Sequence, residues 1–490
     1  MIRRSPKRRL NAYLLAGLAA LLVCASLAPA TASAKNLPLL NTGVSYVYGN
    51  EPVEFEHTAA AGANRVLVPM RWWDVAPDNL PANWNPENPA DPNYDWSFYD
   101  IWVRNATAAG LTPVLQVRGA PSWAQECGPL KPDEPCKPNP AMLEQFARAT
   151  ALHFNGSVPG VPRVTYLQGL NEPNLSLFFN PQYEGNQVVS PILYRRLINA
   201  FYNGVKSVMP SDVVIAAGLG PIAVPKFTIG PMKFAREMLC MTGRANPKPI
   251  KGNSCEGGVH FDVFDVHPYT TGGPTHEGGP DDVELGDIPK LQRLLRAANK
   301  AGRIKSNIYK KTPLWIIELS WDSKPPDPGG LPTNIENQWI AEALYRSWKA
   351  GVYSFFWFSI VDFEPQGLPY NISTESGLYY WNPNPHLQQP KPIINAFRFP
   401  FVAFPEKDGL FVWGRTSVYK GGKVAIQAKR GGAYKTLKVI RAGSNGMFSA
   451  TLKSHYGRDK KGDVRAVYFG ETSVPFPMNP VGDFIQPPFG

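Results

Sequence analysis

Two glutamates, Glu172 and Glu318, each follow a short apolar segment and carry the carboxylate that acid–base and nucleophilic chemistry requires. Glu172 lies in the segment 166–174 and Glu318 in the segment 313–321, 146 positions further along the chain. A carboxylate at the end of a buried strand is expensive to bury unless it is paired or used. Two carboxylates that converge on one site can act as general acid and nucleophile, which is the arrangement that glycoside hydrolysis needs.

The elements that must position these glutamates are short apolar strands that alternate with amphipathic helices between about residues 40 and 400. The pattern predicts eight strands: Gly43–Tyr48, Arg65–Met70, Thr112–Val117, Val164–Leu170, Val213–Ala217, Phe261–Val266, Leu314–Ile317 and Tyr353–Ile360. It predicts helices at Phe98–Ala109, Met142–Phe154, Leu193–Val208, Ile288–Ala301 and Asn337–Ala350. Gly110 and Gly351 directly follow two of these helices, at the position where a left-handed residue often caps a helix end. Eightfold strand–helix alternation indicates an α/β fold, a (β/α)8 TIM barrel, over residues 35–403.

In such a barrel the carboxyl ends of the strands carry the site, and polar and aromatic residues gather at the predicted strand ends. Besides the two glutamates these are Arg71, Asn171, His267, Tyr269, Trp123, Trp321 and Trp357. Aromatic rings stack on sugar rings, so the tryptophans are candidate substrate contacts. Trp72 and Trp73 are adjacent, so at most one of them is expected to face the site.

Residues 404–490 have a different pattern, with short alternating strands separated by Gly-rich turns. Period-two alternation is typical of strands with one wet face, so we expect a small antiparallel β-sandwich-like domain. Two roles stay open for this domain. It is either a stabilising spacer or a module for cell-wall carbohydrate, the latter because of Trp413, Tyr419 and Tyr434.

Residues 1–34 have the basic head, apolar stretch and small-residue end of a secretory signal peptide. We therefore expect a secreted, extracellular protein; lipidation of Cys24 is an alternative, although Val23 fits a lipid-attachment motif poorly. Without the five basic residues of the signal, 45 Lys and Arg face 39 Asp and Glu, a net charge of +6. This charge is too small to indicate a nucleic-acid partner, and no later segment is apolar enough for a membrane span.

The cysteines after the signal fit an oxidising compartment. Cys127 with Cys136 and Cys240 with Cys255 are the local pairs, and we predict both as disulfide bonds, with free thiols or a metal site as alternatives. The histidines His260, His267 and His276 lack the spacing of metal ligands, so we predict neither a metal nor an organic cofactor.

Three motifs in this order resemble the retaining glycoside hydrolases of clan A, a group that includes cellulase-like and xylosidase/iduronidase-like families. The motifs span residues 169–174, 265–269 and 315–321. The resemblance implies that Glu172 is the acid/base and Glu318 the nucleophile. It also implies that Arg71 and Tyr269 contact the nucleophile, that Asn171 binds the sugar 2-hydroxyl and that Trp357 lines a subsite.

These observations together predict a secreted O-glycosyl hydrolase of the retaining type, acting on a polysaccharide or glycoside by double displacement. A transglycosylase would use the same glutamates, and a non-catalytic cell-wall carbohydrate-binding protein would need only the barrel. Single residues also have structural alternatives: Glu172 as a solvated loop residue, Glu318 as an ion-pair partner of Arg71 and His267 as a packed, hydrogen-bonded side chain.

Overall fold

The computed structural model describes residues 37–47, 52–127, 132, 134–252, 255, 257–365, 374–407, 409–429, 431–453 and 461–479. The predicted signal peptide with Cys24 lies outside these residues. Of the helices in the described residues, none combines the length and apolarity needed to cross a bilayer.

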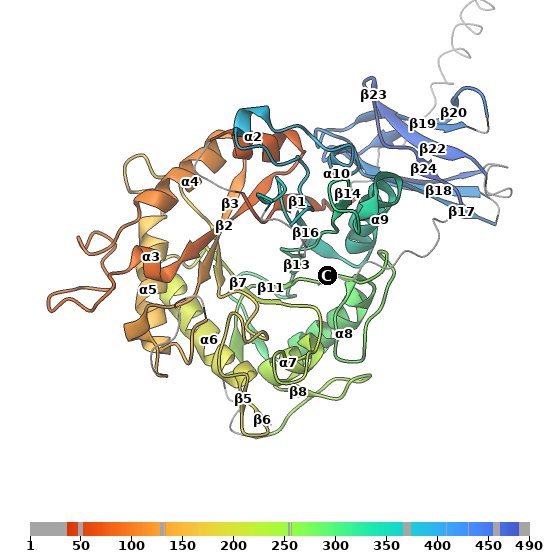
Figure 1. The fold of residues 1–490 in the computed structure, drawn as a ribbon. Coiled ribbons are helices and arrows are strands. Elements are labelled where there is room, and N and C mark those ends of the chain that lie inside the picture. The colour runs from red at the N-terminus through yellow and green to blue at the C-terminus, as the bar shows by residue number, and fades with distance from the viewer. Residues whose placement is uncertain are drawn as a thin grey trace, which may run out of the picture. The chain divides into compact units, whose positions relative to one another are not determined.

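Eight parallel strands close into a barrel in the order β1-β16-β13-β11-β7-β4-β3-β2 (Figure 1). Their bounds are β1 Asn41–Val44, β2 Arg65–Arg71, β3 Thr112–Arg118, β4 Tyr166–Gly169, β7 Val213–Leu219, β11 Val263–Val266, β13 Leu314–Ile316 and β16 Val352–Trp357. Each corresponds to a strand that the sequence predicts, so the (β/α)8 barrel is confirmed. Because the strands are parallel, their carboxyl ends lie together at one end of the barrel.

The barrel interior is filled by large apolar side chains, as expected of a packed TIM-barrel core. Its members are Leu67, Val114, Val213, Ile215, Val263, Trp315, Ile317 and Phe356. Near the amino ends of the strands, the Arg65 guanidinium lies 4.6 Å from the ring centre of Tyr166 and 4.5 Å from that of Trp315. No described carboxylate pairs with Arg65, and these aromatic faces stabilise its buried charge.

Helices surround the barrel on the outside (Figure 1). They are α2 Pro52–Ala60, α3 Trp72–Val75, α4 Ser97–Ala108, α5 Pro140–His153, α6 Ser190–Val208, α7 Pro231–Met238, α8 Ile288–Lys300, α9 Thr333–Lys349 and α10 Ile394–Arg398. The five predicted helices are all present, whereas the sequence pattern missed four short ones, α2, α3, α7 and α10. Gly110 and Gly351 have φ values of 77° and 82°, which confirms both left-handed caps.

The loops hold smaller elements. These are the two-residue strands β5 Tyr183–Glu184, β6 Gln187–Val188, β8 Met241–Thr242, β9 Lys248–Pro249, β10 Val259–His260, β12 Ile304–Lys305, β14 Ser323–Lys324 and β15 Leu331–Pro332, with the 3-10 turns Ser122–Ala124, Leu285–Asp287 and Pro385–Leu387. Disulfide bonds join Cys127 to Cys136 and Cys240 to Cys255, with S–S distances of 1.98 and 2.03 Å.

Antiparallel sheets follow the barrel, as the sequence predicts. One contains β17 Phe401–Glu406, β18 Gly409–Arg415 and β21 Met447–Lys453; the other contains β19 Gly422–Lys429, β20 Lys435–Ala442, β22 Asp463–Tyr468, β23 Glu471–Thr472 and β24 Phe476–Pro477. Arg415 joins this region to the barrel, because its Nη1 donates to Thr42 Oγ1 (2.9 Å) and its Nη2 to the carbonyl of Phe397 (3.1 Å). Arg415 is 1% exposed, so these contacts are inside the protein.

Candidate active site

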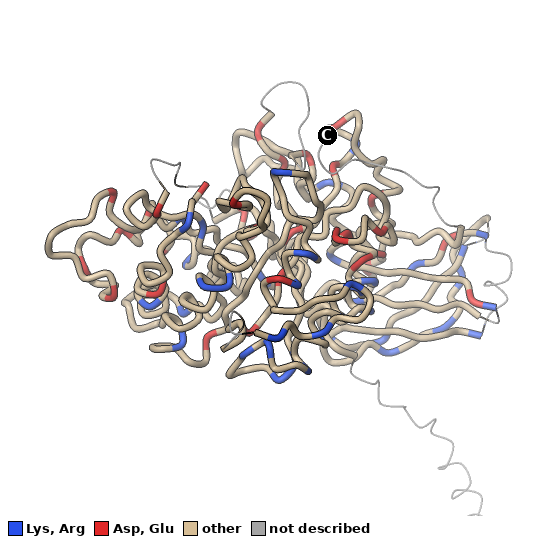
Figure 2. The backbone as a smooth tube through the Cα atoms, turned by 90° about the horizontal axis from the view of Figure 1, so that it is seen from below, with Lys and Arg blue, Asp and Glu red and all other residues tan. Residues whose placement is uncertain are grey.

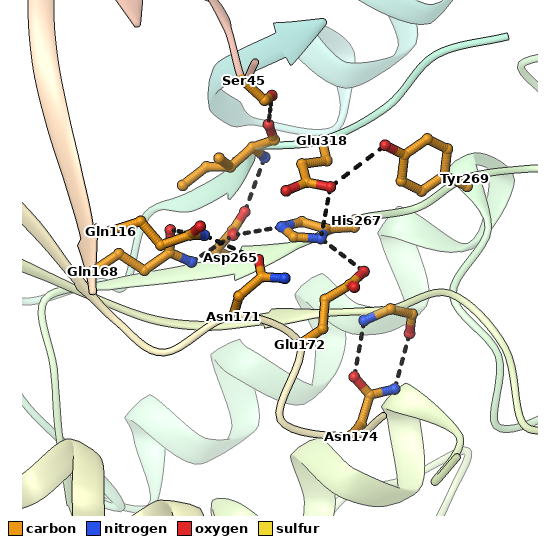
Figure 3. Close-up of polar contacts among 12 residues, drawn as sticks. Ser45, Gln116, Gln168, Asn171, Glu172, Asn174, Asp265, His267, Tyr269 and Glu318 are labelled. Atoms are coloured by element: carbon orange, nitrogen blue, oxygen red, sulfur yellow. Dashed lines mark hydrogen bonds and ion pairs between the residues drawn. The ribbon is translucent and has the colours of Figure 1, made fainter. Parts of the chain in front are cut away.

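Glu172 and Glu318 meet at the carboxyl ends of β4 and β13 (Figure 3). One carboxylate oxygen of each and a ring nitrogen of His267 all lie within 4.8 Å of one another. Glu172 is 8% exposed and Glu318 is 7% exposed. Neither is a solvated loop residue, and the two chain segments come together only because the barrel closes.

The loop after β4 holds Glu172 in an unusual backbone conformation. Leu170 and Glu172 have φ values of 67° and 41°. These values lie in the left-handed region, which residues other than glycine rarely adopt. The Glu172 N–H donates to the carbonyl of Gly218 (3.1 Å). Asn174 fixes the same loop, because its Nδ2 donates to the carbonyl of Gly220 (3.1 Å) and its Oδ1 accepts from the N–H of Gly220 (2.9 Å). Asn174 therefore has a structural role next to Glu172.

His267, which follows β11, connects the two glutamates. Its Nδ1 lies 2.9 Å from Glu172 Oε1 and 3.7 Å from Glu318 Oε2. Its Nε2 lies 3.1 Å from Asp265 Oδ2. The ring is fully buried, so these carboxylates, and not water, surround it.

A chain of buried polar groups supports Asp265 from the neighbouring strands (Figure 3). Gln168 Nε2 donates to Asp265 Oδ2 (2.9 Å), and Gln116 Nε2 donates to Gln168 Oε1 (3.0 Å). Gln116 Nε2 also donates to Asn171 Oδ1 (3.0 Å), while Asp265 Oδ1 accepts from the N–H of Ile317 (2.9 Å). Buried hydrogen-bond networks of this kind restrict the rotamers of their members. Asn171 is thereby oriented beside Glu172.

Gly218 is the residue that lets this network pack so closely. Its φ is 63°, and a Cβ at this position would lie 2.9 Å from both Asp265 Oδ2 and Gln168 Nε2. A larger residue would therefore displace the group behind His267.

In this site, burial and neighbouring charges act in opposite directions on the pKa values of His267 and Glu318. Burial lowers the pKa of His267, but the negative charges of Glu318 and Asp265 outweigh burial and hold this pKa well above its ordinary value. Burial raises the pKa of Glu318, and the positive charges of His267 and Arg118 oppose the rise. His267 is therefore a cation at neutral pH that favours the ionised form of Glu318.

The arginine beside Glu318 is Arg118 and not Arg71, which corrects the expectation from the resemblance. Arg118 Nη2 lies 3.3 Å from Glu318 Oε1. Arg71 instead pairs with Asp74 at 3.5 Å, and its side chain is 58% exposed. Both arginines end a strand and are partners in register, so the strand pattern could have suggested either. Arg71 also borders α3, and its side chain turns toward the first turn of that helix.

Tyr269 reaches the same carboxylate, with its hydroxyl 3.5 Å from Glu318 Oε2. Burial and the charges of Glu318 and Glu172 raise the Tyr269 pKa well above its ordinary value, so the phenol stays a donor.

The three tryptophans predicted as substrate contacts differ in burial. Trp357 is fully buried and its Nε1 donates to the carbonyl of Ser376 (2.7 Å), while Trp321 is 3% exposed and donates to the carbonyl of Gly272 (3.3 Å). Trp123 is half-buried and donates to the carbonyl of Pro77 (2.8 Å). Trp72 is buried and Trp73 half-buried, consistent with at most one of them facing the site.

Two groups of side chains in the described ranges bring three potential metal-binding atoms within 4.8 Å of one another. The first is Glu172, His267 and Glu318; a protonated imidazole donates hydrogen bonds and cannot bind a cation through the same nitrogen. The second is Asp322, Asp327 and Glu375, of which Asp322 accepts from the N–H of Glu375 (3.2 Å) and Asp327 from that of Gly329 (2.7 Å).

Comparison with known proteins gives a likeness of fold. No family model matches this chain, and no curated protein matches its sequence. Among solved structures, a family 39 glycoside hydrolase from Bacteroides cellulosilyticus WH2 aligns with a TM-score of 0.51 at 17% identity, over 85% of this chain and 81% of that chain. The GH39 enzyme from Xanthomonas axonopodis pv. citri aligns with a TM-score of 0.50 at 15% identity, over 86% and 94% of the two chains. The predicted resemblance to clan A barrels is confirmed at the level of the fold.

Proposed function

From a barrel shared with two family 39 glycoside hydrolases, we propose that this protein is a retaining O-glycosyl hydrolase that acts on a polysaccharide or glycoside. The observation that carries the proposal is the approach of Glu172 and Glu318, whose nearest carboxylate oxygens lie within 4.8 Å of each other. Retaining enzymes hold their two carboxyl groups about 5–5.5 Å apart, whereas inverting enzymes need roughly 6.5–9.5 Å for an intervening water. The 4.8 Å limit refers to the nearest oxygens and not to the carboxyl groups as a whole, so double displacement is supported by this approach together with the resemblance to clan A.

In the first step Glu318 attacks the anomeric carbon. The carbon–oxygen bond to the leaving group breaks, and Glu172 gives its proton to that oxygen. Arg118 and Tyr269 hold the Glu318 carboxylate from two sides, at 3.3 and 3.5 Å, and favour the charged form that attacks. In the second step Glu172 takes a proton from water, which attacks the same carbon and releases Glu318.

His267 acts between these steps as a buried cation. Its Nδ1 proton bonds Glu172 Oε1 when that carboxylate is charged, which is the state after the leaving oxygen has been protonated. Asp265 holds the opposite nitrogen of the ring, so the ring cannot turn away. Asn171, whose Oδ1 is occupied by Gln116, keeps Nδ2 free to donate to a sugar hydroxyl, the 2-hydroxyl if the clan resemblance holds.

Secretion is part of this proposal. The signal-like segment 1–34 and the two disulfide bonds both suit an exported protein. We also retain the predicted division into a catalytic barrel, residues 35–403, and a β domain, residues 404–490, through which the protein is proposed to associate with a cell wall. Trp123 and Trp321 stay proposed substrate contacts, whereas the Trp357 ring is fully buried and offers no face to a ligand.

The test begins with a panel of aryl glycosides and polysaccharides. On an active substrate, proton NMR is expected to show a first product with the anomeric configuration of the substrate. An activated 2-fluoro glycoside is expected to label the peptide that contains Glu318, as read by mass spectrometry. An inverted product, or a label on another residue, would reject the mechanism. Adding an acceptor sugar distinguishes hydrolysis from the alternative, transglycosylation, because only the latter yields mainly transfer product.

A further inference from the structure

Positive charge is concentrated in the last part of the chain. Residues 404–490 contain 14 Lys and Arg against 6 Asp and Glu, whereas residues 35–403 contain 31 against 33. Figure 2 shows Lys and Arg repeated along the strands of the C-terminal sheets. The barrel is therefore close to neutral, and the excess of positive charge belongs to the region that follows it.

The strands β19, β20 and β22 place part of this charge on one face of their sheet. Along β19 the buried residues are Val424, Ile426 and Ala428, and the residues between them, from Lys423 to Lys429, face outward. In register, Lys423 lies opposite Arg441 of β20, and Gln427 lies opposite Arg465 of β22. We call Lys423, Lys429, Arg441 and Arg465 the basic face. Lys423 and Lys429 are six residues apart on one strand, about 20 Å.

Within the part of the chain that the structure describes, the cations of the basic face have no carboxylate partner. Lys423 and Arg441 are like charges directly opposite each other, a pairing that destabilises a sheet unless an anion compensates for it. Asp463 is opposite Lys429 in register, yet among the described residues no carboxylate forms an ion pair with any member of the basic face. The face thus keeps its charge available to a ligand.

Tyr434 and Gln427 hold one of these charges in place. The Arg465 guanidinium lies 3.9 Å from the ring centre of Tyr434, and Lys429 Nζ lies 5.7 Å from the same ring. Gln427 Oε1 accepts from Arg465 Nε at 3.0 Å. Gln427 occupies Nε of Arg465, and the guanidinium plane packs on the Tyr434 ring. The two terminal nitrogens of Arg465 are therefore oriented to bind a planar carboxylate in bidentate fashion.

We propose that the basic face binds an anionic polysaccharide, a linear polymer with carboxylate groups along its length. Charge complementarity carries the proposal, since four cations that form no ion pair with a described carboxylate lie on one face of the sheet. Gln427 and Thr436, joined by a hydrogen bond of 3.4 Å between the charged rows, offer the polar groups that sugar hydroxyls need. This inference concerns a surface outside the active site and does not depend on the proposed hydrolysis.

Other polyanions fit the face less well. Single-stranded nucleic acid binds through bases stacked on open aromatic rings, but the Tyr434 ring is already covered by Arg465. An anionic bilayer needs several apolar side chains to anchor a protein. On the outward side of these strands Val439 is 51% exposed and Val467 is half-buried, and the exposed Phe469 lies beyond the end of β22.

The test uses the full-length protein and polygalacturonate as the probe, with neutral xylan, duplex DNA and phosphatidylglycerol vesicles for comparison. Affinity electrophoresis is expected to show retardation of the wild type by polygalacturonate, weakened by added salt. The variant Lys423→Gln/Lys429→Gln/Arg441→Gln/Arg465→Gln is expected to lose at least about tenfold in affinity. If this variant does not fold, the double variants Lys423→Gln/Arg441→Gln and Lys429→Gln/Arg465→Gln are measured instead. Each is expected to lose part of the affinity for polygalacturonate.

A charge-matched control removes four exposed cations from the barrel: Arg293→Gln/Arg296→Gln/Lys300→Gln/Lys311→Gln. It is expected to bind polygalacturonate as the wild type does. Equal losses in both variants, tighter binding to DNA or vesicles, or no binding of the wild type at low salt would each overturn the proposal. Activity on a soluble aryl glycoside is expected to be the same in all variants, so this outcome is independent of the proposed hydrolysis.

Discussion

Two groups of buried carboxylates are built differently. The first lies where β4, β11 and β13 end, and the second joins α9 to the segment after β16. In the first, which we call the catalytic group, Glu172, Glu318 and Asp265 surround His267, with Arg118 beside them. In the second, which we call the lysine group, Glu336, Asp362 and Glu375 surround Lys391. Lys391 Nζ lies 2.6 Å from Asp362 Oδ1 and donates to the carbonyl of Glu375 at 2.7 Å.

The balance of charge separates the two groups. The catalytic group has two cations for three carboxylates, and the cations favour the ionised form of Glu318. The lysine group has one cation for three carboxylates, and burial dominates there. Burial raises the pKa of Glu336 to about 8 and that of Asp362 to about 6, although the positive charge of Lys391 opposes both rises.

The catalytic group and the lysine group also differ in where their carboxylate oxygens point. The oxygens of Glu172 and Glu318 face one point between two strand ends, where a reacting atom can be placed. Glu336 lies on α9 and is fully buried; its Oε1 accepts from Ser323 Oγ at 3.0 Å. A perturbed carboxylate is therefore a sign of burial, and convergence with compensating cations is what indicates chemistry.

The largest expected effect is that of Glu318→Gln. The amide is close in shape but cannot form the covalent intermediate, so kcat on an active glycoside is expected to fall by roughly four orders of magnitude or more. Glu336→Gln is the matched control, because it makes the same change in the lysine group, and its kcat is expected to stay near the wild-type value. Similar losses in the two variants would contradict the distinction between the groups.

Next is His267→Gln, which removes the cation between the glutamates. The kcat/KM is expected to fall about 10²- to 10³-fold. The pKa of Glu318 then rises further, so the acidic limb of the pH profile moves to higher pH. His153→Gln is the control, since the His153 ring also binds a carboxylate, Asp100 Oδ1 at 2.8 Å, but on a barrel helix. An unmoved acidic limb in His267→Gln would indicate a packing role only.

A smaller effect, and one on stability instead of activity, is expected for Lys391→Met. Removing the cation leaves Asp362 and its neighbours buried without compensation, and the free energy of unfolding is expected to fall by about 3–5 kcal/mol. Urea denaturation measures this, with kcat of the folded protein unchanged. Lys137→Met breaks an exposed pair with Glu184 and is expected to leave the midpoint nearly unchanged. A strong loss of kcat in folded Lys391→Met would show that the lysine group contributes to activity and would contradict the distinction between the two groups.

The smallest expected effect, counted per pH unit, is that of Glu336→Gln on stability. A carboxyl whose folded pKa is raised binds more protons in the folded than in the unfolded state. Its contribution is therefore complete below about pH 4.5 and is lost as pH rises toward about 8. Wild-type unfolding free energy is expected to fall by up to about 1 kcal/mol per pH unit in this window relative to the variant. Parallel curves for the two proteins, from urea denaturation at pH 5 to 8, would refute this.

Much of the molecule was predictable because its signals are local in the chain. Each barrel strand is an apolar segment that is buried on both faces, and the predicted strand Arg65–Met70 differs from the observed β2 by one residue. Glu172 and Glu318 could be identified because each follows such a strand within three residues. The short helices α2 and α7, nine and eight residues long, carry too few turns for a clear period.

The sequence by itself determined the eightfold alternation, the change to antiparallel strands after the barrel, the local cysteine pairs and the two glutamates as candidates. Only the tertiary structure decided which arginine lies beside Glu318, that His267 stands between the glutamates, and that Trp357 is buried. The physical reason is the range of each effect. Hydrophobic period and turn chemistry act within a few residues, whereas the pairing of Arg118 with Glu318 joins groups 200 positions apart and depends on how the closed barrel directs each strand end.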